Sequence, residues 1–151
     1  MRFKQVSGLL QGVANARLAL AQAYERLATQ VDSTRTRMVL DYLASRERQG
    51  YESLERYLQQ APQAVLNTWF QGAFDSDFIS RVAHLDADSR ATPADVLTLA
   101  LRLDNELVAL LAQQAAQAPT PESRETLLSV MADEQTNQRK MVLNVARFED
   151  I

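Results

Sequence analysis

The sequence predicts an all-α protein built as a four-helix bundle. The 151 residues are rich in Ala, Leu, Gln, Arg and Glu, which favour helices, and include only four glycines and four prolines to make turns. Four long segments also repeat apolar residues at alternating steps of three and four, as amphipathic helices do. A chain of this length buries one core, so we expect a single bundle domain over residues 1–151.

The predicted helices form two antiparallel hairpins. We expect them at residues 3–30, 33–60, 93–117 and 121–147. The second helix should stop ahead of Pro62, because the residue before a proline avoids the helical region. Thr92-Pro93 and Thr120-Pro121 each offer an N-cap followed by proline at the first helical position, so they start the last two helices.

The longer connection between the hairpins, residues 61–92, is the predicted crossover, with two short helices around Gly72. Its aromatic residues are Trp69, Phe70, Phe74 and Phe78. We expect these rings to plug one end of the core. The alternative is a contact patch for a protein partner.

Composition excludes several classes of function. The net charge is -3 and no segment concentrates Lys or Arg, which argues against nucleic acid as a partner. The absence of cysteine removes disulfides and thiol chemistry, and no Ser-His-Asp set or Gly-rich phosphate loop is present. No segment approaches the ~18–20 apolar residues of a membrane span, and the first residues read as a helix start. We therefore expect a cytoplasmic protein with no membrane contact and no cofactor.

The apolar stripe of each predicted helix is interrupted near its middle by residues that are not apolar side chains. These residues are Arg17 in the first helix, Glu47 and Gly50 in the second, Asp104 in the third, and Gln135 and Gln138 in the fourth. Arg17 and Glu47 lie equally far from the first turn, at a height of ~22 Å for a rise of 1.5 Å per residue. Asp104 and Gln135 lie at nearly the same height above the second turn. One polar layer should therefore cross the bundle.

Two of these helices carry a recognisable motif. SRERQGYESL contains Glu47, with Gly50 three residues later, and ADEQTNQRKM contains Gln135 and Gln138 at the same spacing. This pattern resembles the rubrerythrin-like branch of the ferritin-like superfamily, whose second and fourth helices each carry Glu-x-x-His facing inward. The resemblance implies that Gly50, Gln135 and Gln138 stand where that family has metal ligands.

The other two helices complete the resemblance. LRLDNELVALL offers Asp104 at the third-helix carboxylate position, and ANARLALAQAY offers Arg17, or Asn15 in another register, where the first-helix Glu should stand. Relatives with complete motifs bind two iron ions and reduce peroxide or oxygen, or oxidise and store iron. Here both motif histidines are missing, and the guanidinium of Arg17 does not deprotonate. We therefore expect a degenerate site that holds no metal and has no catalytic residue.

In place of metal we expect a buried network in which Arg17 pairs with Glu47 and Asp104, with Gly50 leaving room for the arginine. Such a bundle would be non-enzymatic and would act by self-association, as a homodimer, or by binding a protein partner. Small-residue runs such as ALAQA and AQQAAQAP permit close helix approach, although ordinary packing within one chain explains them equally well.

Other registers leave a metal-dependent alternative open. Glu134 and Asn137 have the motif spacing. The alternative function is a redox or iron-handling protein with an atypical site built from Glu47, Asp104 and Glu134 together with Gln135 and Gln138, whose oxygen ligands would suit Mg²⁺ or Mn²⁺ better than an iron pair. We interpret Glu134 instead as part of a solvated face, because it adjoins Asp133 and falls off the expected stripe. The remaining candidates, which we also assign to the surface, are Glu25, Glu106 and the single histidine, His84.

Overall fold

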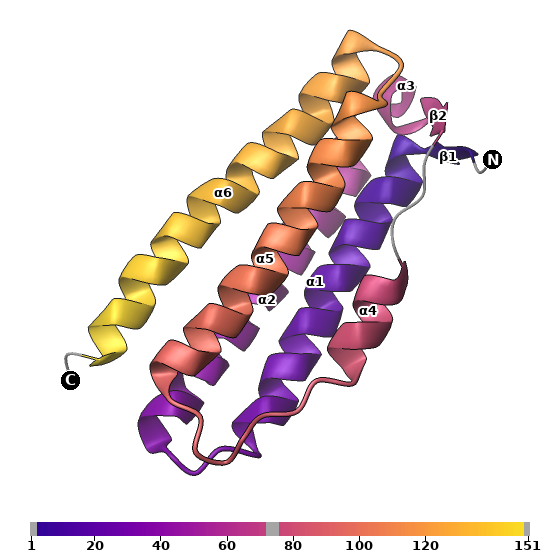
Figure 1. Ribbon diagram of the computed structural model, residues 1–151. Helices are drawn as coiled ribbons and strands as arrows, with labels where there is room; N and C mark the ends of the chain where they lie inside the picture. The colour runs from indigo at the N-terminus through magenta and orange to yellow at the C-terminus, as the bar shows by residue number, and fades with distance from the viewer. Residues whose placement is uncertain (1–2, 72–75, 150–151) are drawn as a thin grey trace.

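Four long helices form a bundle in the computed structural model, which describes residues 3–71 and 76–149 (Figure 1). The helices are α1 (Val6–Ala28), α2 (Thr34–Gln60), α5 (Pro93–Ala116) and α6 (Pro121–Glu149). The predicted all-α fold class is confirmed. No helix in these two stretches combines the length and apolar character needed to cross a membrane.

The long helices pack as two antiparallel hairpins, α1 with α2 and α5 with α6 (Figure 1). The two hairpin turns lie at opposite ends of the bundle, so the crossover runs back along its length before α5 begins. Polar side chains fix where the helices start. Thr92 and Asp95 form a capping box at the start of α5, and the hydroxyl of Thr120 accepts a hydrogen bond of 3.1 Å from the backbone of Ser123 in α6.

The first helix begins at Val6 rather than at residue 3. The preceding residues form β1 (Phe3–Gln5), which pairs antiparallel with β2 (Trp69–Gln71) of the crossover. The backbone N–H of Val6 then donates to the carbonyl of Thr68 at 3.0 Å. Backbone pairing between these distant segments outweighs extension of the helix by one turn.

Two short helices lie in the crossover, α3 (Gln63–Leu66) and α4 (Ser76–Ala83). Phe78 of α4 is fully buried, as expected for a ring that plugs the core, and α4 packs against α1. Trp69 is 60% exposed and does not plug the core. Gly72 and Phe74 lie outside the described residues.

The core is formed by apolar side chains from all four long helices. Its largest fully buried members include Leu20, Tyr24, Leu27, Leu40, Leu43, Leu107, Leu111, Leu127 and Met141.

The register of α6 differs from the predicted one. Leu127, Glu134 and Met141 face the core, whereas the predicted stripe through Leu128 and Val142 is partly exposed. The difference is about one residue, or ~100° of helix rotation. Adjacent apolar pairs, Leu127-Leu128 and Met141-Val142, make the two stripes nearly equal in hydrophobicity, so periodicity alone does not choose between them.

Candidate functional site

Arg17 of α1 lies at the centre of a buried polar cluster and is only 3% exposed. Its Nη1 donates to Glu47 Oε2 of α2 at 2.7 Å and lies 3.3 Å from Asp104 Oδ1 of α5. Its Nε donates to Glu134 Oε1 of α6 at 3.2 Å, and its Nη2 pairs with the other oxygen of the same carboxylate. One guanidinium therefore contacts a carboxylate from each of the three other long helices.

A second arginine closes the cluster from the side. Arg46 of α2 donates from Nη1 to Glu47 Oε1 and from Nη2 to Asp104 Oδ2, each at 3.0 Å. Two guanidiniums thus face three carboxylates, which leaves a formal charge of -1 if all are ionised. Every oxygen of the three carboxylates has a guanidinium nitrogen as its partner.

The cluster shifts the proton affinity of its members. Burial alone would lower the pKa of Arg17, but the charges of Glu47 and Asp104 outweigh it and the net shift is upward, so the guanidinium stays charged. Burial raises the pKa of Glu47; Arg17 opposes this shift and the charge of Asp104 adds to it. One surplus carboxylate in a low-dielectric interior explains why a proton is held here more tightly than on a surface glutamate.

Tyr24 lies two helical turns beyond Arg17 on α1 and is fully buried. Burial, together with the negative charges of Glu47 and Asp104, raises the pKa of its phenol well above 10. The phenol is therefore neutral at physiological pH, and its hydroxyl has no hydrogen-bond partner among the described residues.

Three of the six residues predicted for the polar layer form this cluster, namely Arg17, Glu47 and Asp104. Gly50 lies beside it: a Cβ built on this glycine would sit 3.7 Å from Arg17 Cδ. The fourth helix contributes a different residue from those predicted. Gln135 is exposed, and Gln138 is half-buried and donates to Asn105 at 2.8 Å outside the cluster. The prediction for both glutamines was wrong because the register of α6 differs from the predicted one by about one residue.

Glu134 and Arg46 are the members of the cluster that the sequence-based prediction missed. The sequence places Glu134 on a solvated face, yet in the structure it is only 9% exposed. The available signal was its spacing, because Glu134 lies seven residues from both Leu127 and Met141, which are fully buried. Arg46 could not be found in this way. It directly precedes Glu47, so it lies beside the apolar stripe of α2 and its side chain reaches the cluster from there.

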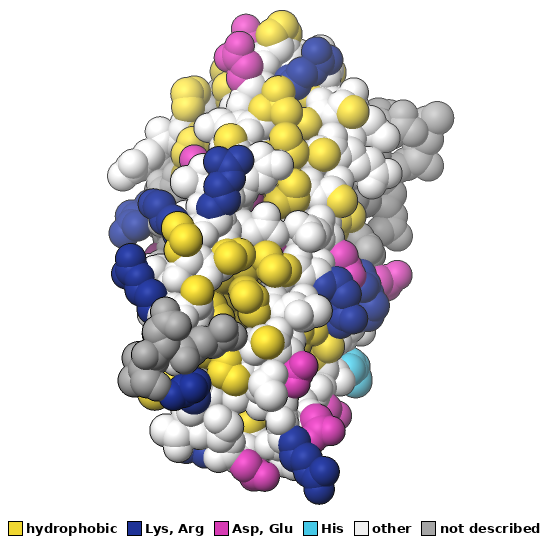
Figure 2. Space-filling model, turned by 60° about the vertical axis from the view of Figure 1, so that its left-hand side comes forward, with side chains coloured by type: hydrophobic (Ala, Val, Ile, Leu, Met, Phe, Trp, Pro, Cys, Tyr) yellow, Lys and Arg dark blue, Asp and Glu magenta, His cyan; other side chains and the backbone are white. Residues whose placement is uncertain are grey.

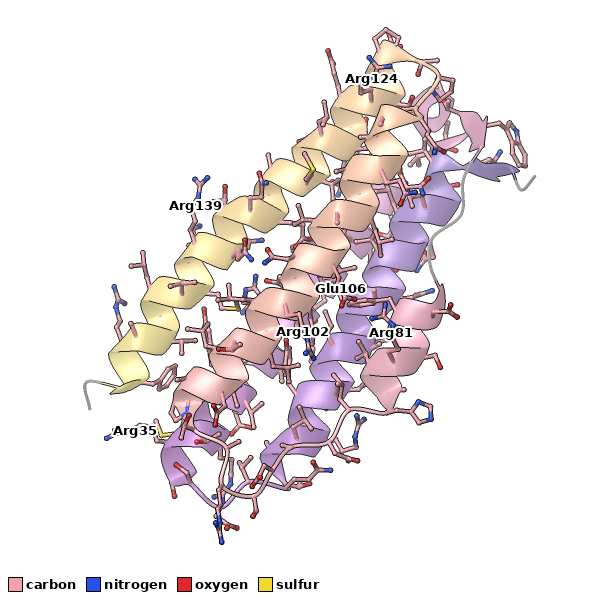
Figure 3. The ribbon with its side chains drawn as sticks, viewed as in Figure 1. Arg35, Arg81, Arg102, Glu106, Arg124 and Arg139 are labelled. Carbon is pink, nitrogen blue, oxygen red and sulfur yellow. The ribbon has the colours of Figure 1, made fainter. Side chains whose placement is uncertain are left out.

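The remaining candidates lie at the surface. Glu106 of α5 and Arg81 of α4 point toward one another and form an ion pair at 3.0 Å (Figure 3). Glu25 is likewise paired with Arg48, and His84 is exposed with its Nδ1 2.7 Å from the carbonyl oxygen of Ser80. Asn15 and Asn137 are exposed.

Comparison with known proteins finds a likeness in structure. No protein-family model matches the chain, and no curated protein matches it. A crystal structure from Thermotoga maritima, provisionally described as a ferritin-like diiron-carboxylate protein, aligns over 94% of this chain and 95% of its own with a TM-score of 0.55. The chain has a ferritin-like fold. Because the two sequences are only 16% identical, the similarity between these proteins is one of fold.

The side chains inside this ferritin-like bundle do not fit a di-metal centre. All six oxygens of Glu47, Asp104 and Glu134 are engaged by guanidinium groups, so the space between the carboxylates is already occupied by cations. A divalent ion there would also be repelled by Arg17, whose charge is fixed. Across the described residues, no three His, Asp or Glu side chains are grouped so as to hold an ion.

Replacing Arg17 should destabilise the protein strongly. We expect Arg17→Ala to lower the free energy of unfolding by ~3–5 kcal/mol, because three buried carboxylates would lose their shared counter-ion. This corresponds to a loss of roughly 10 °C in melting temperature. The matched control is Arg48→Ala, which removes an exposed pair and should cost less than ~1 kcal/mol. A thermal melt of Arg17→Ala within a degree or two of wild type would contradict the proposed role.

The raised pKa of Glu47 predicts a pH-dependent stability difference. Below about pH 4.5 the carboxyl is protonated in both the folded and the unfolded protein. As the pH rises, the unfolded chain releases this proton first, so folding loses stability until the pH passes the raised folded-state pKa. We therefore expect the wild type to lose free energy of unfolding relative to Glu47→Gln as the pH rises above about 4.5, measured by urea denaturation. Glu52→Gln controls for loss of an exposed carboxylate on α2. A constant difference across this range would show that Glu47 does not titrate as described.

Substitutions at Gly50 test how closely Arg17 packs on α2. Alanine fits, because its Cβ would make an ordinary contact with the arginine stem, and it should stabilise the helix by ~0.5–1 kcal/mol. Gly50→Leu has the same helical advantage but must displace Arg17, so it should be less stable than Gly50→Ala. Equal stability of the two variants in chemical denaturation would mean that the arginine does not occupy this space.

Proposed function

We propose that this protein is a ferritin-like bundle that works without a di-metal centre and acts by associating with protein. In this proposal its ancestor belonged to the rubrerythrin-like branch, and Arg17 took over the space and the charge of a metal ion. The observation that carries the proposal is the complete use of the carboxylate oxygens of Glu47, Asp104 and Glu134 by two arginines.

The position of the cluster supports this origin. Arg17, Glu47, Asp104 and Glu134 come from the four long helices, one from each, and ferritin-like carboxylate proteins likewise draw their metal ligands from all four helices. The structural neighbour from Thermotoga maritima is itself described as a diiron-carboxylate protein. In this chain the same construction surrounds an organic cation.

The alternative, an atypical oxygen site made by the three carboxylates, requires a larger rearrangement. A metal ion would have to displace Arg17 and Arg46 together, leaving the first of these charges buried without a partner. Leaving a buried charge unpaired costs several kcal/mol, which a weak oxygen site does not offset.

Exposed apolar side chains support a role in association. Trp69 is 60% exposed and Leu143 is 66% exposed, and both are large enough to anchor a protein contact. Aromatic and aliphatic anchors of this kind contribute most when they enter a pocket on the partner.

The proposal predicts a protein that neither carries nor responds to metal. We expect elemental analysis of protein purified without chelators to give less than about 0.1 Fe, Mn or Zn per chain, and added Fe²⁺ or Mn²⁺ to leave the melting temperature unchanged, because a bound ion would stabilise the folded state. Peroxide and oxygen consumption in the presence of Fe²⁺ should match the protein-free rate. About two metal ions per chain, lost in Glu47→Gln, would overturn the proposal and reinstate a metal-dependent redox function.

A further inference from the structure

We propose that the interior of the bundle binds one ordered water molecule between the hydroxyl of Tyr24 and the buried polar cluster. The inference goes beyond the proposed function and does not depend on it. Three features point to the site: two buried donors without a partner, a layer of alanines next to the cluster, and the surplus negative charge of the cluster itself.

Two hydrogen-bond donors beside the cluster have no partner within the described residues. One is the hydroxyl of Tyr24, whose side chain is fully buried. The other is the Nε of Arg46, whose two Nη atoms are both engaged by carboxylates. A buried donor without a partner costs free energy, and proteins satisfy such groups with protein atoms or with ordered water. The two donors therefore call for a ligand that accepts hydrogen bonds.

The phenol of Tyr24 is directed toward the cluster. Long side chains on a helix lean toward its N-terminus, and on α1 that direction leads from Tyr24 to Arg17, seven residues or two turns away. The pKa of the phenol responds to the charges of Glu47, Asp104 and both arginines, as expected for a hydroxyl near them. Because this pKa is raised, the phenol keeps its proton and remains a donor.

Alanines line the level between Tyr24 and the cluster. One helical turn from the cluster residues of α1, α2 and α5, the same helix faces carry Ala21, Ala44 and Ala100, all of them buried. Short side chains on three helices at one level leave room for the ring of Tyr24, which enters from the next turn of α1. They also leave room beside its hydroxyl for a molecule of the size of water.

A water molecule matches the polarity of this position. Its oxygen accepts hydrogen bonds, so it serves both donors. Its two hydrogens suit the carboxylates, because each carboxylate oxygen has two lone pairs and uses one for a guanidinium. An anion would be repelled by the surplus carboxylate of the cluster, and a cation has no lone pair for the two donors. The charges and the donors together therefore select a neutral molecule that both donates and accepts.

Apolar residues surround this part of the interior. Leu20 and Leu43, the neighbours of Ala21 and Ala44 in the sequence, are fully buried. Figure 2 brings the side of the molecule formed by α6 forward and shows hydrophobic side chains gathered in a band along it. A water in such surroundings depends on the cluster and on Tyr24 for its hydrogen bonds, so removing one partner should be measurable.

The sign of one change in stability tests the site. Tyr24→Phe removes the hydroxyl and keeps the ring, so we expect the melting temperature to fall by about 2–4 °C as the water loses a partner. A hydroxyl that truly has no partner predicts the opposite, because removing a buried unsatisfied donor stabilises the fold. Tyr57→Phe is the matched control, since Tyr57 is 36% exposed on α2 and should leave the melting temperature unchanged. An unchanged or raised melting temperature in Tyr24→Phe would overturn the site.

A crystal structure at about 1.5 Å resolution separates a bound water from a direct contact. We expect a density peak within about 2.6–3.2 Å of Tyr24 Oη and Arg46 Nε, and its loss or weakening in crystals of Tyr24→Phe. A hydroxyl bonded directly to a carboxylate, with no peak between them, would overturn the water even if the melting temperature falls, and would leave the proposed function standing. An anomalous signal from iron or manganese at the peak would overturn both.

Discussion

The buried charge of Arg17 constrains the whole bundle. A guanidinium that stays ionised in the interior must be surrounded by acceptors, and here these come from α2, α5 and α6 at once. Outside the cluster, Asn144 of α6 also joins the two hairpins by donating to the hydroxyl of Tyr42 in α2 at 2.9 Å. Sliding or rotating one hairpin against the other would separate Arg17 from its partners, so the cluster fixes their relative position.

The cluster contributes more to selecting one alignment of the four helices than to the net stability of the fold. A buried ion network contributes little beyond what well-packed apolar side chains of the same volume would contribute, because desolvation of the charges offsets their attraction. The surplus carboxylate, visible in the raised pKa of Glu47, adds to that cost. We interpret the cluster as a device that excludes alternative registers, since apolar residues alone would tolerate several alignments of four Ala- and Leu-rich helices.

How far the sequence predicts this site depends on the helix. Arg17, Glu47 and Asp104 were predictable because each is a single polar residue in an unambiguous apolar stripe, and because equal distances from a turn place residues level in a hairpin. Glu134 was not predictable in this way. Apolar residues occur in adjacent pairs on α6, so periodicity fits two stripes and does not show which of them faces the core. The strand Phe3–Gln5 was also missed, since three residues are too few to show a period and their pairing partner lies far away in the sequence.

The ambiguity of α6 is resolved by electrostatics, with a consequence at the surface. If Gln135 faced inward, Arg17 would keep only the carboxylates of Glu47 and Asp104, and a neutral amide would replace the third. With Glu134 inward, the guanidinium gains a bidentate carboxylate, the stronger arrangement in a low-dielectric interior. That choice turns the stripe of Leu128, Gln135 and Val142 outward. The arginine in the core therefore determines which apolar face of α6 is turned outward.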